Sequence, residues 1–325
     1  MSLDLYIPHY KIMNIKKNKE ILLISPRGFC AGVTRAIDTV VEVLEKFGPP
    51  VYVKHEIVHN KHVIDDLKAK GAIFIEDIND APIDKPLVFS AHGVAKNILD
   101  TAKQMNKYVV DATCPLVTKV HVQAIKFYNL DYKIILIGHK NHPEVEGTLG
   151  QLPAGGIMLI ENLDDIQNLK FENEDKLAYV TQTTLSVDDT KEIIDALKKK
   201  FPHIKSSPKE DICYATTNRQ NAIKEYAHEC DSFIVVGSKN SSNSNRLVEV
   251  AKKSGCDLSV LLENASNLNI DNYKNHQTIG LSSGASVPDI LVQDVISKFR
   301  EAFEINVKEV GAGEENISFK LPRGI

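Results

Sequence analysis

Three of the five cysteines stand in related settings along the 325-residue chain. Their contexts are Arg27-Gly-Phe-Cys-Ala-Gly around Cys30, Asp111-Ala-Thr-Cys-Pro-Leu around Cys114 and Asp211-Ile-Cys-Tyr-Ala around Cys213. Each cysteine lies between a strand-like run and a helical pattern, and a threonine follows four residues later, at Thr34, Thr118 and Thr217. Five cysteines are too few, and uneven in number, for a disulfide scaffold of this length. Thiols repeated in this way would suit a metal centre.

Three thiolates at one point have two main chemical uses. Iron–sulfur clusters are held by cysteine thiolates, usually four, so three would leave one iron of a cubane without a protein ligand. Zinc with an open position is the other candidate, although the close CxxC pairs common in zinc sites are absent. The remaining interpretation is that all three are small buried side chains. We interpret Cys230 and Cys256, which lie outside the repeat, in that way.

The spacing of the cysteines indicates an internal repeat. The interval from Cys30 to Cys114 is similar to the interval from Cys114 to Cys213, and each is the length of a small domain. The related segments 138–141 and 237–240 start at the same offset from Cys114 and Cys213, so His142 and Ser241 also fall at equal offsets. The first unit matches more loosely, with His59 one position further from Cys30. We predict a polar lead-in over 1–20, α/β domains over 21–113, 114–210 and 211–300, and a tail over 301–325 that is extended from Val307.

Short apolar runs alternate with helical patterns. The runs predict strands over 21–25, 50–54, 73–75 and 87–90, and apolar spacing predicts helices over 33–47, 60–70 and 94–105. This alternation favours the α/β class: three pseudo-symmetric domains, with parallel-type sheets flanked by helices, around a central cluster-containing cavity. Ligands of parallel sheets bind beyond the carboxyl ends of the strands. We therefore expect the three cysteines to converge there.

A second set of polar residues falls at other strand ends. Its members are His59, His92, His142, Thr183, Ser241, Ser242, Asn243 and Ser286. Neutral donors at helix N-termini, together with imidazoles that can take up a proton, make an anion site. Glu144 stands beside them as a candidate proton donor. The alternatives are helix caps and turns for the serine and asparagine cluster, and solvated surface positions for single histidines and for Glu144.

Composition excludes several classes of protein. A net charge of -4, an absence of Trp and an aromatic content of 6% argue against nucleic-acid binding. No GxxxxGK[ST] and no GxGxxG after a strand is present, which disfavours P-loop NTPases and nicotinamide enzymes. The longest apolar runs are strand-sized and no signal peptide is visible, so we expect a soluble protein that binds no membrane.

Six motifs resemble those of the LytB/IspH family over about residues 21–320. They are Pro26-Arg-Gly-Phe-Cys-Ala-Gly32, Ser90-Ala-His-Gly-Val94, Asp111-Ala-Thr-Cys-Pro-Leu-Val-Thr-Lys119, His142-Pro-Glu-Val-Glu-Gly147, Thr181-Gln-Thr-Thr-Leu-Ser186 and Gly237-Ser-Lys-Asn-Ser-Ser-Asn-Ser-Asn245. The resemblance implies an iron–sulfur oxidoreductase that removes the hydroxyl group of (E)-4-hydroxy-3-methylbut-2-enyl diphosphate. The products would be isopentenyl and dimethylallyl diphosphates, made in the last step of the non-mevalonate isoprenoid pathway.

The resemblance also implies roles for particular residues. A [4Fe–4S] cluster would lie on Cys30, Cys114 and Cys213. The diphosphate would be held by His59, His92, His142, Ser241, Ser242, Asn243 and Ser286. Glu144, with Thr183, would deliver protons, and we place both, together with His142, among the catalytic residues; Thr183 and His142 are also expected to bind substrate. Electrons would come from a ferredoxin- or flavodoxin-type donor.

Two other functions stay open at this point. An iron–sulfur hydro-lyase would use the same three-cysteine cluster without an external reductant. A non-catalytic metal-binding or redox-sensing protein would need the cysteines but not the anion site. The expected compartment is a plastid-type organelle, such as the apicoplast stroma, if the source is eukaryotic, and otherwise a bacterial cytoplasm.

Overall fold

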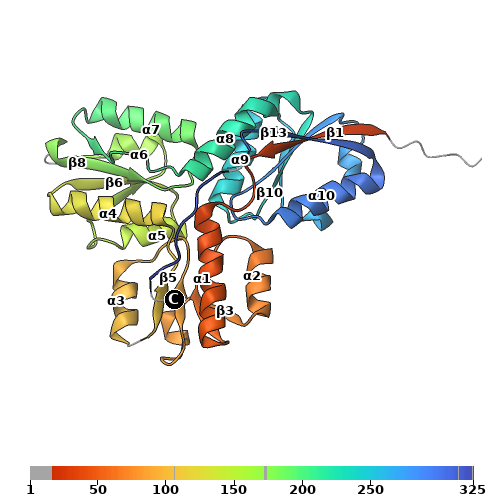
Figure 1. Cartoon of the computed structure of the whole chain (residues 1–325). Helices are drawn as coiled ribbons and strands as arrows, with labels where there is room; N and C mark the ends of the chain where they lie inside the picture. The colour runs from red at the N-terminus through yellow and green to blue at the C-terminus, as the bar shows by residue number, and fades with distance from the viewer. Residues whose placement is uncertain (1–16, 106, 172–173, 314, 324) are drawn as a thin grey trace, which may run out of the picture.

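The computed structural model describes residues 17–105, 107–171, 174–313, 315–323 and 325. Three parallel sheets, each flanked by helices, form three domains (Figure 1), which confirms the predicted α/β class. Most of the predicted lead-in lies outside the described residues, and its last residues already belong to a strand that begins at Asn18. None of the helices in the described part of the chain has both the length and the apolar character needed to cross a membrane.

The strands fall into three sheets. The first sheet has the order β3-β2-β4-β5, from β2 (Val51–Lys54), β3 (Ala72–Ile75), β4 (Leu87–Phe89) and β5 (Val109–Asp111). The second has the order β7-β6-β8-β9, from β6 (Lys133–Ile137), β7 (Ile157–Ile160), β8 (Leu177–Thr181) and β9 (Lys205–Ser206). The third has the order β11-β10-β12-β1-β13, from β1 (Asn18–Ser25), β10 (Ser232–Val236), β11 (Ser259–Leu262), β12 (Thr278–Ser283) and β13 (Glu304–Gly311).

Helices connect these strands and cover the sheets. They are α1 (Ala31–Phe47), α2 (Lys61–Ala69), α3 (Lys96–Gln104), α4 (Pro115–Asn129), α5 (Pro143–Leu149), α6 (Leu163–Asn168), α7 (Val187–Lys200), α8 (Tyr214–Tyr226), α9 (Ser242–Lys253) and α10 (Asp289–Ala302). Short 3₁₀ turns occupy Ile78–Asp80, Glu174–Lys176, Ala227–Glu229, Ala265–Asn267 and Ile270–Tyr273. The predicted helices over 33–47, 60–70 and 94–105 correspond to α1, α2 and α3 with small shifts at their ends.

The first strand differs from the expected domain boundaries. Residues 21–25 were expected to open the first domain, but β1 pairs with β12 and β13 in the third sheet. In the strand orders, β1 occupies the place in the third sheet that β5 and β9 occupy in the first two. The apolar run predicts a buried strand correctly, but its partners lie near the opposite end of the chain, and local sequence carries no information about them.

The chain passes from one domain to the next at each of the three cysteines. Cys30 follows β1 of the third sheet and precedes α1, whose Val40 and Val43 pack in the core of the first domain. Cys114 likewise precedes α4, which packs on the second sheet, and Cys213 precedes α8, which packs on the third. Three equivalent crossings therefore lie between three sheets, and this arrangement brings the cysteines toward the centre.

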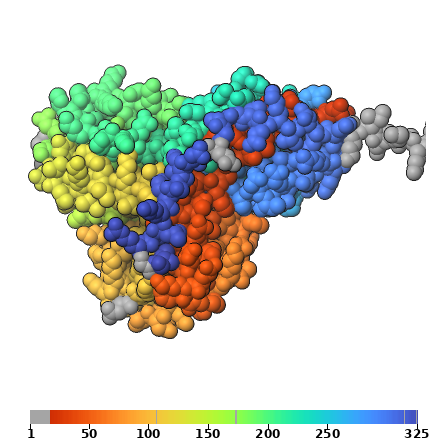
Figure 2. All heavy atoms as spheres, in the orientation of Figure 1, coloured from red at the N-terminus to blue at the C-terminus, as the bar shows by residue number. Residues whose placement is uncertain are grey.

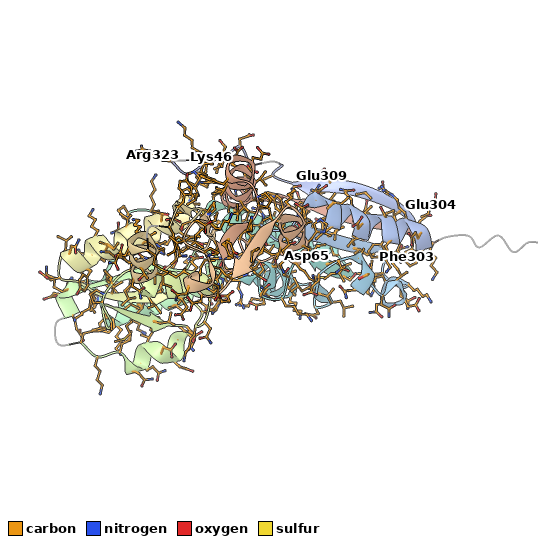
Figure 3. The ribbon with its side chains drawn as sticks, turned by 90° about the horizontal axis from the view of Figure 1, so that it is seen from below. Lys46, Asp65, Phe303, Glu304, Glu309 and Arg323 are labelled. Carbon is orange, nitrogen blue, oxygen red and sulfur yellow. The ribbon has the colours of Figure 1, made fainter. Side chains whose placement is uncertain are left out.

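The predicted tail over 301–325 begins at the end of α10 and contains β13, the edge strand of the third sheet. Beyond β13 the chain leaves this sheet and runs alongside α1 to reach the first domain (Figures 1 and 2), where Ile325 packs against the core. Figure 3 shows Glu304 and Glu309 along β13 and Arg323 on the side of Lys46, at the end of α1. The extended tail thus connects the third domain to the first.

Candidate active site

The three cysteines occupy equivalent backbone positions. Each is the N-cap residue of its helix, and none of the three thiols caps the helix. The backbone N–H groups of Cys30, Cys114 and Cys213 donate to the carbonyl groups of Ala285, Ala91 and Thr183, at 3.2, 3.0 and 3.0 Å. Each of these carbonyls lies two residues beyond the end of its strand, β12, β4 or β8. The thiols are therefore free to face the space beyond the strand ends.

A glycine leaves room for the thiols. A Cβ atom added to Gly32 would lie 2.6 Å from Cys114 Sγ and 3.9 Å from Cys30 Sγ. Burial raises the pKa of the Cys114 thiol to about 12 and that of the Cys213 thiol to about 11. Such thiols become thiolates only beside a positively charged group. The described residues contain no set of three His, Cys, Asp or Glu side chains arranged to hold one metal ion.

One cavity collects the predicted site residues of all three domains. Its walls include Cys30, Cys114, Cys213, His59, His92, His142, Glu144, Thr183, Ser241, Ser242, Asn243 and Ser286. His59, His142 and Ser241 each follow the end of a strand by five residues, after β2, β6 and β10. His92 and Ser286 likewise follow β4 and β12 by three. The domain topology therefore explains why residues far apart in sequence meet.

Three imidazoles form the centre of the polar wall. The ring centroids of His59 and His92 stack at 4.1 Å, and His142 meets the two rings edge-on at 5.6 and 5.9 Å. Burial, followed by the neighbouring histidines, holds the pKa of His92 well below its usual value and lowers the pKa of His142 to about 3. Both rings are therefore neutral at pH 7 when the cavity holds no anion.

The tautomers of two histidines follow from their hydrogen bonds. His142 Nδ1 accepts from the backbone N–H of Glu144 at 3.2 Å, so its proton lies on Nε2. His59 Nδ1 lies 3.1 Å from Glu56 Oε2, and Asn240 Nδ2 donates to the same oxygen at 2.8 Å. His59 Nε2 is buried and has no hydrogen-bond partner in the described protein. With Nδ1–H donating to Glu56, a second proton on Nε2 would give a charged donor for an anion.

The serines and Asn243 divide into two groups. Both amide atoms of Asn243 are buried without a partner in the described protein, and Ser241 Oγ accepts from Ser244 while keeping its own proton to donate. The hydroxyl of Ser242, in contrast, donates to Thr184 O at 3.1 Å, and that of Ser286 donates to His59 O at 3.0 Å. Both bonds join the third domain to its neighbours, so these two hydroxyls would have to rotate to reach a ligand.

Glu144 lies in the same cavity as the thiols and is 3% exposed. Its Oε1 accepts from the backbone N–H of Thr183 at 2.6 Å, and its Oε2 accepts from the Thr183 hydroxyl at 2.9 Å. Burial raises the pKa of Glu144 to about 7, while the bonds from Thr183 oppose this rise. A carboxyl group with a pKa near neutrality is able to donate a proton and to recover it at physiological pH.

Several residues of the site were not predicted from the sequence. Thr216 lines the cavity, and its hydroxyl lies 3.2 Å from Cys213 Sγ. Glu56 and Asn240 support His59 from two different domains. Thr216 stands three residues after Cys213, but valines occupy the equivalent positions after the other two cysteines. The repeat therefore contained no signal for it.

Comparisons with known proteins are consistent with this geometry. A family model described as LytB protein matches residues 21–300. A protein of Beijerinckia indica named 4-hydroxy-3-methylbut-2-enyl diphosphate reductase is 52% identical over 312 residues, which cover 96% of this chain and 98% of the relative. A protein of the same name from Neisseria gonorrhoeae is 53% identical over 305 residues, 94% of each chain.

Solved structures give the same result. A structure of the E-1-hydroxy-2-methyl-but-2-enyl-4-diphosphate reductase from Plasmodium falciparum superposes with a TM-score of 0.90 at 45% sequence identity. The match covers 94% of this chain and 96% of that one. A second structure, of (E)-4-hydroxy-3-methyl-but-2-enyl diphosphate reductase, described as the terminal enzyme of the non-mevalonate pathway, has a TM-score of 0.62 at 32% identity. This match covers 87% of this chain and 99% of that one.

Proposed function

Because this chain belongs to the LytB family, we propose that it reduces (E)-4-hydroxy-3-methylbut-2-enyl diphosphate, the terminal reaction of the non-mevalonate isoprenoid pathway. The protein is an enzyme and an oxidoreductase. The reaction consumes two electrons and two protons. It breaks the bond between carbon and the hydroxyl oxygen, releases that oxygen as water, and yields isopentenyl and dimethylallyl diphosphates.

The observation that carries this proposal is one cavity in which three thiols, a wall of histidine, serine and asparagine side chains and a protonatable carboxyl group meet. The three cysteines fit an iron–sulfur cluster because Gly32 leaves space beside two of them and because the thiols line one cavity and cap no helix. We propose that Cys30, Cys114 and Cys213 hold a [4Fe–4S] cluster. When bound, this cluster would supply electrons and an iron without a protein ligand, which acts as a Lewis acid.

We assign substrate binding to the polar wall. Hydrogen-bonding capacity that no described residue uses remains at four places: His59 Nε2, His142 Nε2, the Ser241 hydroxyl and the Asn243 amide. Ser241 also caps α9, whose N-terminal N–H groups add a favourable dipole for a diphosphate. His92, Ser242 and Ser286 would complete the set after the two serine hydroxyls release their carbonyl partners. Holding the diphosphate there would fix the distance from the hydroxyl end to the thiols.

We assign proton delivery to Glu144, with Thr183 as the residue that holds its carboxyl group in place. Both oxygens of Glu144 are bound by Thr183, so the carboxyl group has one orientation in the cavity. One proton would leave with the hydroxyl group as water, and the other would end on carbon. His142, which bonds the backbone of Glu144, is the third residue that we place in the catalytic group.

The electron donor and the compartment also belong to the proposal. We propose a ferredoxin- or flavodoxin-type donor, which the resemblance to the LytB/IspH family implies, because the reaction consumes two electrons. The relatives come from bacteria and from Plasmodium falciparum. We therefore propose that the protein works in a bacterial cytoplasm or, if the source is eukaryotic, in a plastid-type organelle.

Iron and sulfide analysis with EPR on anaerobically purified protein, before and after substrate is added, tests the proposal. We expect iron and sulfide in equal amounts, a spectrum that changes with substrate, and turnover only with a reduced donor. Cys114→Ser is expected to give cluster-poor protein, whereas Cys256→Ser, outside the cavity, keeps the cluster. Turnover without a reductant would indicate a hydro-lyase. Zinc in place of iron, or a cluster without diphosphate-dependent turnover, would indicate a metal-binding or sensing protein.

A further inference from the structure

Each helix that begins at a cysteine carries a cation in its first turns. Arg35 follows Cys30 by five residues on α1, Lys119 follows Cys114 by five on α4, and Arg219 follows Cys213 by six on α8. Each of these three side chains reaches the loop that carries the next cysteine of the set. We call Arg35, Lys119 and Arg219 the bridging cations.

Each bridging cation donates to a backbone carbonyl close to a cysteine, and Lys119 Nζ also forms an ion pair with Asp211 Oδ1 at 3.3 Å. Arg35 NH1 donates to Thr113 O at 2.9 Å, the residue directly before Cys114. Lys119 Nζ donates to Glu210 O at 2.6 Å and to Lys209 O at 3.0 Å, just before Cys213. Arg219 NH2 donates to Gly28 O at 2.9 Å, two residues before Cys30. The three contacts close a ring in which each cysteine helix holds the next cysteine loop.

Two of the bridging cations are also bound by the C-terminal segment. Glu315 Oε2 lies 2.9 Å from Arg219 NH1, and Lys320 O accepts from Arg35 Nε at 2.8 Å. This is the segment that runs alongside α1 from the third domain to the first (Figures 1 and 2). Arg219 is 1% exposed, and a charge so deeply buried needs a partner such as Glu315. The C-terminal segment therefore binds Arg35 on α1 of the first domain and Arg219 on α8 of the third domain at the same time.

We propose that Arg35, Lys119 and Arg219 are positioning residues that hold the three cysteines of the cluster site in one constellation, with residues 315–323 locking the two arginines. This inference rests on the proposed function, because it concerns retention of the cluster. The physical reason is that the three thiols come from three separate domain crossings, and each crossing would otherwise move with its own domain. Groups that orient metal ligands commonly change metal affinity by roughly 10- to 100-fold when they are removed.

The charge of the bridging cations adds a second effect. Three cysteine thiolates bring negative charge into a buried site, and nearby cations stabilise it. Loss of one cation makes it less favourable to add an electron there. We therefore expect both slower reduction of the cluster at a given potential and weaker retention when a bridging cation is removed.

The test uses full-length Arg35→Gln, Lys119→Gln and Arg219→Gln proteins, with Lys126→Gln as the matched control. Lys126 is exposed on α4, two turns beyond Lys119. Each protein is reconstituted anaerobically, its iron and sulfide are counted, and loss of the cluster to an iron chelator is timed. Thermal unfolding of the cluster-free proteins and the midpoint potential of the cluster are measured in parallel.

We expect the bridging-cation variants to lose the cluster roughly tenfold faster than wild type, with midpoint potentials shifted to more negative values. Lys119→Arg, which keeps the charge, should restore retention, and Lys126→Gln should behave as wild type. If Arg219→Gln or Lys119→Gln fails to fold because Glu315 or Asp211 is left unpaired, the test rests on the half-buried Arg35, whose hydrogen bonds go to the carbonyl groups of Thr113 and Lys320.

Wild-type loss rates and potentials in Arg35→Gln and Lys119→Gln would overturn the inference while leaving the proposed function intact. The same changes in Lys126→Gln would overturn it as well, because they would show a general effect of surface charge. A wild-type protein that takes up no iron and sulfide would overturn the proposed function, and this inference with it.

Discussion

Thr183 binds both oxygens of the Glu144 carboxyl group, one through its backbone N–H and one through its hydroxyl. Its carbonyl group accepts the backbone N–H of Cys213 at 3.0 Å. One residue thus links the candidate proton donor to a candidate cluster ligand. The chemistry that we propose depends on this link, because the proton donor has to lie close to the cluster that would supply the electrons.

Glu144→Gln tests the proton donor. The amide is nearly isosteric, so we expect the fold, the cluster and substrate binding to persist, while turnover falls by about 10² to 10⁴. Anaerobic steady-state assays with a reduced donor, together with calorimetric binding of substrate, measure the two effects separately. Glu146→Gln is the control, because Glu146 is exposed on the same helix. Near wild-type turnover of Glu144→Gln would remove Glu144 from the mechanism.

The pH dependence of turnover reports on the same carboxyl group. Burial raises the pKa of Glu144 to about 7, so its protonated, donating form disappears as the pH rises through about 7. We expect kcat/KM, which reports ionisations of the free enzyme, to decline above that pH. The Thr183 hydroxyl lowers the pKa of Glu144, so Thr183→Val should move the alkaline decline to higher pH. The neighbouring Thr184→Val, whose hydroxyl bonds Gln182, should leave its position unchanged. Identical profiles for both variants would contradict the assignment.

Gly32→Ala tests the space for the cluster. The new Cβ would lie 2.6 Å from Cys114 Sγ, closer than van der Waals contact allows, so the thiol or the helix has to shift. We expect a folded protein with low iron and sulfide content after reconstitution. Thr34→Ala places the same residue on an exposed position of α1 and serves as the control. Full iron and sulfide in Gly32→Ala would argue against a cluster at this place.

Diphosphate binding should depend on the neutral donor of His142. Burial lowers the pKa of His142 to about 3, so the ring is neutral at pH 7, with Nδ1 accepting from the Glu144 N–H and the proton on Nε2. His142→Phe removes this donor and should weaken the binding of inorganic diphosphate, measured by calorimetry, by roughly tenfold or more. His203→Phe, at an exposed histidine, is the control and should bind as wild type. Equal affinities of the two variants would exclude His142 from the anion site.

Local sequence determined the fold class and the repeated positions of the cysteines. Strand-like and helical runs alternate because backbone hydrogen bonding and apolar spacing act over a few residues. The equal offsets of His142 and Ser241 reflect equal loop lengths after β6 and β10. The residue types of the motifs were sufficient to indicate the LytB family, which the comparisons confirm. These features can be predicted from the sequence because they depend on residues that are close to one another along the chain.

Tertiary structure alone decided how those residues are used. The pairing of β1 with β12 and β13 depends on contacts between distant segments, and it places β1 between these two strands in the third sheet. The pKa of Glu144 is raised because the carboxyl group is buried, and local sequence does not show that this side chain is buried. Ser242 and Ser286 have the residue types of anion donors, but their hydroxyls bind carbonyls of neighbouring domains. The bridging cations were present in the sequence at nearly equal offsets, yet their role emerges only where three domains meet.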